Sequence, residues 1–217
     1  MKILITRILE ENSALQKWCV SKKIDLIQSS FISTEIIHVE NIPSTNWIFF
    51  TSPKCVNYFL KQHSITTQKV AAVGEGTAKA LENREITCDF VGRSTDTREV
   101  GQNFKGVLGK ETALFPIGNR SLKKIQNELN KDQVEEVTVY RTESITQEIP
   151  NDLTAIICSS PSNGEGLKIS GLNYQIPMIA FGKSTEAFLR NELNQDNVIS
   201  LSAFNEDAIV QALESLL

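Results

Sequence analysis

Short apolar segments alternate with amphipathic segments along the whole chain. The short segments are rich in apolar residues, as expected of buried strands, and cover residues 3–6, 47–51, 70–73, 89–91, 113–117, 153–158, 178–181 and 198–201. The segments with apolar residues at helical spacing cover residues 11–22, 53–61, 77–83, 98–105, 121–130, 162–169, 184–191 and 206–216. This strand–helix alternation predicts an α/β protein whose parallel sheets carry helices on both faces.

The sequence also repeats itself at an offset of 108 residues. Thr51-Ser52-Pro53 aligns with Ser159-Ser160-Pro161 at this offset, Gly74 aligns with Gly182, and Thr77 aligns with Thr185. Because these matches occur in the same order in both halves, they indicate two similar α/β domains.

Two long extended segments, 25–39 and 134–148, contain no helix between their halves. A chain that leaves one domain and later returns to it needs two such crossings. We therefore predict a discontinuous first domain formed by residues 1–34 and 147–217, and a second domain formed by residues 40–138. Residues 35–39 and 139–146 are then two linker strands.

Composition and charge exclude several classes of protein. The 22 Lys and Arg against 26 Asp and Glu give a net charge of −4, which argues against a nucleic-acid partner. The apolar runs are far shorter than the ~20 residues of a membrane span, and no signal peptide opens the chain, so we expect a cytoplasmic protein without membrane contact. Four scattered cysteines and two histidines lack the spacing of a metal site.

The candidate binding residues follow the predicted strands, where ligands of open parallel sheets bind. These loops are rich in small hydroxyl residues and glycines, which can hold carboxylates or phosphates at helix N-termini; the candidates are Thr51, Ser52, Gly74, Thr77, Ser160, Gly182 and Thr185. Each Ser or Thr taken alone is more often a helix N-cap than a binding group. The duplication of the same loops in two domains favours a binding role, with the two sets facing one another across a cleft.

Known nucleotide motifs and nucleophile–base pairs are absent from the sequence. Lys79 stands where a dinucleotide fingerprint needs its third glycine, and Pro177 stands where a phosphate loop needs its first. Tyr140 is the more interesting candidate, because a phenol is protonated at neutral pH and can donate a proton to a leaving group. A purely structural role for Tyr140 within the extended segment is equally compatible with the sequence.

The ordered set of motifs resembles the uroporphyrinogen-III synthase family over nearly the whole chain. The segments that carry the resemblance are residues 3–7 (ILITR), 47–53 (WIFFTSP), 70–74 (VAAVG), 137–142 (VTVYRT), 159–162 (SSPS) and 180–185 (AFGKST). The chain departs from the family pattern at Ile8, where a proline usually follows the opening Thr-Arg.

The resemblance implies an α/β fold of two flavodoxin-like, doubly wound parallel-sheet domains joined by a two-stranded linker. It implies a cofactor-free cyclising lyase of porphyrin and heme biosynthesis. The substrate is then hydroxymethylbilane, a linear tetrapyrrole that loses a hydroxyl from ring A to give an electrophilic azafulvene. Attack by ring D forms a spiro intermediate, and ring closure follows with ring D inverted.

The resemblance also assigns roles to residues. It makes Tyr140 the donor to the leaving hydroxyl, and it places substrate-binding groups at Arg7, Thr51, Ser52, Gly74, Thr77, Ser160, Gly182 and Thr185. It implies no metal, and we expect a monomer whose partner is the tetrapyrrole substrate. The alternative interpretation of the sequence is a non-catalytic, two-lobed cytosolic module that binds a small anionic ligand.

Overall fold

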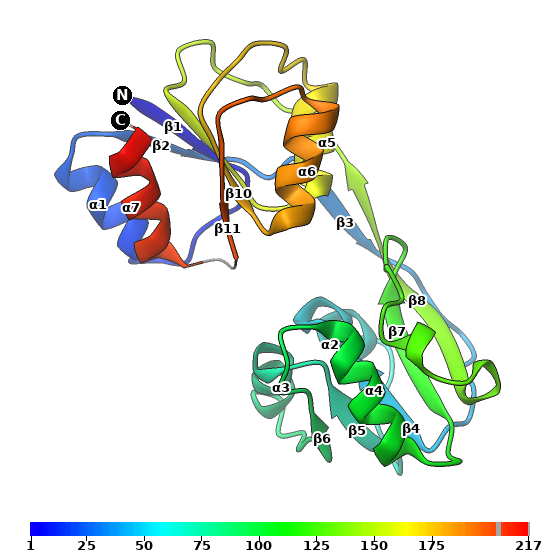
Figure 1. Cartoon of the computed structure of the whole chain (residues 1–217). Helices are drawn as coiled ribbons and strands as arrows, with labels where there is room; N and C mark the ends of the chain where they lie inside the picture. Colours follow the sequence, from blue (N-terminus) through cyan, green and yellow to red (C-terminus); the bar gives the residue numbers. More distant parts are fainter. Residues whose placement is uncertain (203–204, 217) are drawn as a thin grey trace. The chain divides into compact units, whose positions relative to one another are not determined.

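The computed structural model describes residues 1–202 and 205–216. The chain divides into two units (Figure 1). Unit 1 combines residues from both ends of the chain, Met1–Ser33 and Glu143–Leu217, and unit 2 is the continuous middle segment Thr34–Thr142. The chain therefore passes from one unit to the other twice, within strands β3 (Ile32–Ile36) and β8 (Val134–Ser144).

Unit 1 is built on a parallel sheet of five strands in the order β11-β10-β9-β1-β2. Its strands are β1 (Lys2–Ile5), β2 (Asp25–Gln28), β9 (Ala155–Cys158), β10 (Met178–Phe181) and β11 (Val198–Leu201). Its helices are α1 (Ala14–Ser21), α5 (Pro161–Ile169), α6 (Lys183–Glu192) and α7 (Glu206–Leu216).

Successive residues of the central strand β1 face opposite sides of this sheet. Ile3 and Ile5 are fully buried in an apolar cluster with α1 and α7, whereas Leu4 is fully buried in a second cluster with α5 and α6. In Figure 1, α1 accordingly lies beside α7, and α5 lies beside α6. The sheet is covered on both faces, which is why its strands read as continuous apolar runs.

Unit 2 has a six-stranded sheet in the order β3-β8-β7-β4-β5-β6. Besides β3 and β8, its strands are β4 (Trp47–Phe50), β5 (Lys69–Ala72), β6 (Phe90–Val91) and β7 (Ala113–Gly118). The pairs β8–β7, β7–β4, β4–β5 and β5–β6 are parallel. Its helices are α2 (Pro53–Phe59), α3 (Glu75–Glu82), α4 (Thr97–Leu108) and the short 3-10 helices η1 (Gln126–Glu128) and η2 (Lys131–Gln133).

Aromatic side chains fill the core of unit 2 beneath α4. The ring of Phe49 packs edge-on against Phe104 at a centroid distance of 4.7 Å and stacks on Phe115 at 5.3 Å. Trp47 meets Phe104 edge-on at 5.3 Å. The other face of the sheet packs Ile48 and Phe50 against α2 and α3. Each such aromatic pair stabilises the fold by about 0.5–1.5 kcal/mol beyond the contribution of the apolar area that it buries.

The strands of the two units have the same order in space. Along the chain, however, they follow one another from different starting strands, as in a circular permutation. In unit 1 the order β2-β1-β9-β10-β11 is the flavodoxin-like order of second, first, third, fourth and fifth strand. In unit 2 the same places are taken by β8-β7-β4-β5-β6, so that β4 corresponds to β9 and β7 corresponds to β1. The predicted fold class of two doubly wound parallel-sheet domains is confirmed, and the permutation explains the 108-residue offset of the motifs.

The helix predicted over residues 121–130 is wrong. The segment contains η1 and, further on, η2, and it occupies the place in unit 2 that α1 occupies in unit 1. Ile125 and Leu129 are buried, but Leu122 is 71% exposed, so a regular helix would leave part of its apolar face in water. Lys123 has a φ of 53°, a left-handed conformation that interrupts a helix.

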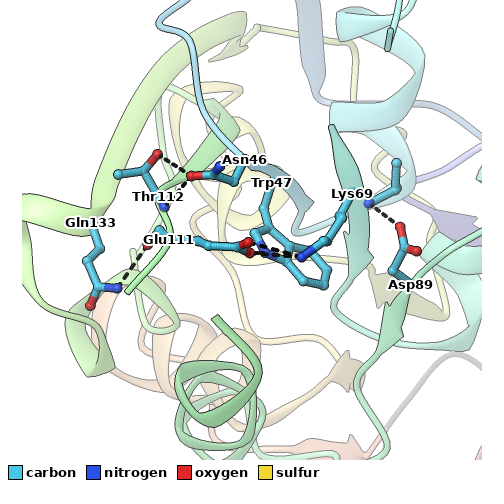
Figure 2. A network of polar contacts seen from close by, with 8 residues as sticks. Asn46, Trp47, Lys69, Asp89, Glu111, Thr112 and Gln133 are labelled. Atoms are coloured by element: carbon cyan, nitrogen blue, oxygen red, sulfur yellow. Dashed lines mark hydrogen bonds and ion pairs between the residues drawn. The ribbon is translucent and has the colours of Figure 1, made fainter. Parts of the chain in front are cut away.

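A polar network ties together the amino ends of β4, β5 and β7 (Figure 2). The indole Nε1 of Trp47 donates to Glu111 Oε2 over 2.5 Å, and the ammonium of Lys69 lies 3.1 Å from both carboxylate oxygens of Glu111. The hydrogen bond from Trp47, followed by that from Lys69, lowers the pKa of Glu111. This edge of the sheet lies opposite the loops that carry the candidate binding residues.

Among the described residues, no helix is long and apolar enough to cross a bilayer.

Candidate functional site

Tyr140 lies on β8 in unit 2, and its ring is fixed by close neighbours. The ring stacks on that of Tyr58 from α2, with a centroid distance of 5.0 Å and an interplanar angle of 26°. Gly118, at the end of the adjacent strand β7, has no side chain, and a Cβ there would lie 2.4 Å from Cζ of Tyr140. The absence of a side chain at position 118 thus makes room for the phenol.

The phenol of Tyr140 stays protonated in this environment. Burial, together with the nearby Cys55 thiol, raises the pKa of Tyr140 to about 12, while a hydrogen bond with Ser52 acts in the opposite direction. A neutral phenol with a hydroxyl partner is a proton donor that keeps its proton throughout the neutral range.

The hydroxyls of Thr51 and Ser52 lie beside Tyr140, where β4 ends and α2 begins. The Ser52 Oγ accepts a hydrogen bond from the Cys55 backbone N at 3.2 Å and so caps α2, and it donates to Cys55 Sγ at 3.2 Å. The Thr51 Oγ1 lies 3.6 Å from the same sulfur. The cap interpretation of Ser52 therefore holds, and the same hydroxyl also contacts the tyrosine.

Gly74 and Thr77 follow β5 in the next loop of unit 2. Gly74 is the N-cap of α3, and its φ of −179° is extended, so its backbone does not require glycine. Thr77 lies in the first turn of α3 and is 3% exposed. The glycine that geometry requires in this region is Gly92, where a Cβ would lie 2.2 Å from the Val73 carbonyl oxygen.

Ser160 opens α5 in unit 1 and belongs to a polar network. Its Oγ accepts hydrogen bonds from the backbone N and the side-chain Nδ2 of Asn163, at 3.2 Å and 3.1 Å. The Asn163 Nδ2 also donates to Ser159 Oγ at 3.1 Å, and Ser159 Oγ donates to the Thr6 carbonyl at 3.0 Å. This network fixes the carboxyl ends of β1 and β9 side by side.

Gly182 and Thr185 form the corresponding loop after β10. Gly182 has a φ of 78°, a conformation that favours glycine, and its carbonyl accepts from the Thr185 backbone N at 3.1 Å. Thr185 is 1% exposed, and its Oγ1 has no hydrogen-bond partner among the described residues. A buried hydroxyl without a partner is destabilising by about 1–3 kcal/mol, a cost that a ligand acceptor would remove. Arg7 follows β1 in the same unit and is exposed.

The structure brings Tyr140, Thr51 and Ser52 together within unit 2, and Gly74 and Thr77 follow the neighbouring strand of the same sheet. Arg7, Ser160, Gly182 and Thr185 lie at the carboxyl ends of neighbouring strands within unit 1. Apart from Tyr140, which lies within β8, the candidates lie in the loops or first helical turns that follow strands, and their role in binding stays a prediction.

Sequence reasoning missed the residues that support these groups. Cys55 and Asn163 are both buried three residues after an N-cap serine, and the 108-residue offset relates one to the other. The 108-residue offset was the signal that could have found them. It aligns the buried Cys55 of unit 2 with the polar Asn163 of unit 1, and an asparagine there indicates a polar site rather than a purely apolar core position. Tyr58 and Gly118 had no comparable signal.

Among the described residues, no group of three His, Cys, Asp or Glu side chains could hold a metal ion.

Comparison with known proteins gives a consistent result. The family described as uroporphyrinogen-III synthase HemD matches residues 26–211. The solved structure of uroporphyrinogen-III synthetase from Helicobacter pylori is similar with a TM-score of 0.70 at 13% identity, covering 100% of this chain and 99% of that one. A mutant uroporphyrinogen III synthase from Thermus thermophilus is similar with a TM-score of 0.58 at 14% identity, covering 99% and 98%. No curated protein sequence matches the chain.

Proposed function

This chain belongs to the uroporphyrinogen-III synthase family, a family of cyclising lyases, and we propose that Tyr140 is its proton donor. In the proposed reaction, hydroxymethylbilane loses the hydroxyl of ring A as water, and the tetrapyrrole closes with ring D inverted. The proton for the leaving oxygen comes from the Tyr140 phenol, and the electron pair of the broken C–O bond leaves with the water. The ring A pyrrole N–H gives up its proton as the neutral azafulvene forms, and this proton restores the Tyr140 phenol. Ring D then attacks the azafulvene to give the spiro intermediate.

The observation that carries this proposal is the position of the Tyr140 phenol. Its ring stacks on Tyr58 at 5.0 Å and fills the space that Gly118 leaves, and its hydroxyl has a hydrogen bond with Ser52. Burial raises its pKa to about 12, so it is protonated at neutral pH. Departure of a hydroxyl requires a proton at the leaving oxygen, and positioned donors contribute roughly 10²–10⁴-fold to such steps. No stronger acid is required, because the linear tetrapyrrole is itself reactive and the protein must chiefly impose its conformation.

The candidate binding residues suit a polycarboxylate. Each unit presents small hydroxyls and helix N-termini at the carboxyl ends of its strands, where unpaired N–H groups favour negative charge. In unit 1 the buried hydroxyl of Thr185 has no acceptor among the described residues, and a substrate carboxylate would supply one. We propose that Arg7, Ser160 and Gly182 act with it, and that Thr51, Ser52, Gly74 and Thr77 serve the same role in unit 2.

We further propose a cytoplasmic monomer that binds the tetrapyrrole and neither nucleic acid nor membrane. The net charge of −4 disfavours binding to a polyanion, which supports the part of this proposal that concerns nucleic acid. Size-exclusion chromatography with light scattering tests the oligomeric state directly. A mass of about twice the 24.2 kDa of one chain would overturn the monomer.

The decisive experiment is an isomer analysis of the product. Purified protein is incubated with hydroxymethylbilane without added metal or nucleotide, the products are oxidised, and the type I and type III porphyrins are separated by chromatography. We expect the type III isomer, because spontaneous cyclisation without the protein gives type I alone. Recovery of type I alone would reject the proposed activity and favour the alternative, a non-catalytic binding module, for which the family match offers no support.

A further inference from the structure

A cavity of about 270 Å³ opens at the carboxyl ends of β4, β5 and β7 in unit 2. Thr51 and Val73, the residues that follow β4 and β5, form one side of it, and the first residue of α4, Thr97, forms another. The remaining wall is the segment after β7, from Ser121 to Gln126. Thr51 lines this cavity and also lies 3.6 Å from the Cys55 sulfur beside Tyr140, so the cavity adjoins the proposed proton donor.

The wall of the cavity is positively charged. Among the described residues that line it are two lysines and no carboxylate. Lys123 is already neutralised by Glu136, whose Oε2 lies 2.5 Å from its Nζ. Lys124 is exposed, and its ammonium forms no hydrogen bond or ion pair within residues 1–202 and 205–216. Lys124 therefore provides an unneutralised charge at the cavity.

The segment that carries Lys124 is fixed at both ends. At its start, Asn119 Oδ1 accepts from the Thr142 backbone N at 2.8 Å, and Arg120 Nε donates to the Thr142 carbonyl at 3.1 Å. At its end, Ile125 is buried against α4, where Gly101 permits an approach so close that a Cβ would lie 3.0 Å from the Ile125 carbonyl oxygen. A segment fixed in this way presents its side chains in a defined position, which lowers the entropy lost on binding.

An apolar side chain stands beside the charge. Leu122 lines the cavity and is 71% exposed, although its neighbours on the segment are polar. The equivalent loop of unit 1, which follows β1, likewise exposes one aliphatic side chain, Ile8, at 65%. A cation next to an exposed aliphatic side chain suits a ligand that combines a flat apolar ring with a carboxylate.

We propose that residues 121–126 form a subsite for one pyrrole ring of the tetrapyrrole and its carboxylate. The Lys124 ammonium pairs with the carboxylate, the hydroxyls of Thr51 and Ser121 donate to it, and Leu122 contacts the ring. This inference rests on the proposed function for the identity of the ligand. Lys124 is a binding residue here and takes no part in proton transfer, so its loss raises KM and leaves kcat unchanged.

The kinetic test compares Lys124→Ala with Lys131→Ala, which removes an exposed lysine from η2 outside the cavity. A charge-assisted hydrogen bond is lost only in the first variant, so its KM for hydroxymethylbilane should rise about tenfold, with kcat and the type III fraction retained. Lys124→Glu should raise KM further. An equal KM in Lys124→Ala and Lys131→Ala would overturn the subsite, whereas formation of the type III isomer by the unmodified protein would leave the proposed function intact.

A binding test is independent of turnover. Uroporphyrin III and coproporphyrin III, which carries fewer carboxylates, are titrated into each protein and followed by quenching of tryptophan fluorescence. The affinity for uroporphyrin III should fall about tenfold in Lys124→Ala and stay unchanged in Lys131→Ala. This result would support the carboxylate subsite even if the unmodified protein formed only type I product. Equal affinities in the two variants would reject the subsite.

Discussion

The ring of Tyr140 on β8 fills the space that a side chain at Gly118 on β7 would need. A Cβ on Gly118 would lie 2.4 Å from Cζ and 2.7 Å from the hydroxyl oxygen of Tyr140, closer than non-bonded atoms approach. The backbone of Gly118 is not in the left-handed region, so the conflict with a side chain is purely one of space. The position of the phenol thus depends on the missing side chain of its neighbour.

Gly118→Ala should therefore displace the Tyr140 ring and reduce turnover. If the phenol is the donor, the expected loss in kcat is roughly 10²-fold, comparable with the removal of a positioned acid. The measurement is the initial rate of type III formation. Gly106→Ala is the matched control, because a Cβ at Gly106 in α4 meets no atom within 4 Å. Full turnover in folded Gly118→Ala protein would show that the position of the ring does not matter.

Tyr140→Phe should lower turnover and leave the fold unchanged. The phenyl ring retains the stacking on Tyr58 at 5.0 Å, so only the hydroxyl is lost. We expect kcat to fall by roughly 10²-fold with little change in KM, because the hydroxyl acts on the leaving group in the transition state. Tyr174→Phe, which removes a phenol of unit 1 whose hydroxyl donates to the Pro150 carbonyl at 3.4 Å, serves as control. Unchanged kcat in Tyr140→Phe would remove this residue from the mechanism.

The stability of the protein should fall between pH 10 and pH 12. The pKa of Tyr140 is raised from its ordinary value of 10.0 to about 12, so the folded state holds its proton over a range in which the unfolded state has lost it. The contribution of this group is complete below pH 10 and is lost as the pH rises through 12. The thiols of Cys19 and Cys158, whose pKa values are also raised by burial, contribute at high pH in the same direction.

Urea unfolding at a series of pH values measures this dependence. Tyr140→Phe should show a smaller loss of stability than the unmodified protein between pH 10 and pH 12, with the thiol contribution remaining. Identical slopes for the two proteins would mean that the phenol titrates in the folded state as it does in the unfolded chain.

Glu111→Gln should destabilise unit 2 at neutral pH. The hydrogen bond from Trp47, and then that from Lys69, lowers the pKa of Glu111, so the carboxylate stabilises the folded state above its ordinary pKa of 4.5. That contribution disappears as the pH falls through the lowered value. Thermal unfolding should give a lower Tm for the variant at pH 7 and converging Tm values in acid. Glu135→Gln is the control at an exposed position; a constant difference at all pH values would argue against the ionic part of the network.

The sequence predicted most of the strands and helices because their burial leaves a clear periodic signal. Met178–Phe181 and Glu206–Leu216 begin and end where the pattern placed them. The segment 121–130 failed because its apolar residues, Leu122, Ile125 and Leu129, have helical spacing, although only the last two are buried. The spacing of apolar residues along the chain predicts a helical face. It does not show whether each of these residues is buried or faces solvent.

The candidate site was predictable to the same extent. Thr51, Ser52 and Tyr140 could be identified from their places after strands and in the extended segment, and the structure places them together. The roles of Tyr58 and Gly118 depend on contacts between segments far apart in the sequence, 82 and 22 residues from Tyr140 respectively, which no local pattern encodes.

The discontinuity of unit 1 has a consequence for synthesis on the ribosome. Strand β1, whose Ile3, Leu4 and Ile5 end fully buried, emerges early, but its neighbour β9 is translated only after all of unit 2. At about 5–20 residues per second, the roughly 150 residues that separate β1 from β9 take about 8–30 s to translate, and the three aliphatic side chains lack their partner strand for that time. During this interval the continuous middle segment can fold on its own, while the nascent N-terminal pair of apolar strand and helix is the part of the chain that chaperones must shield.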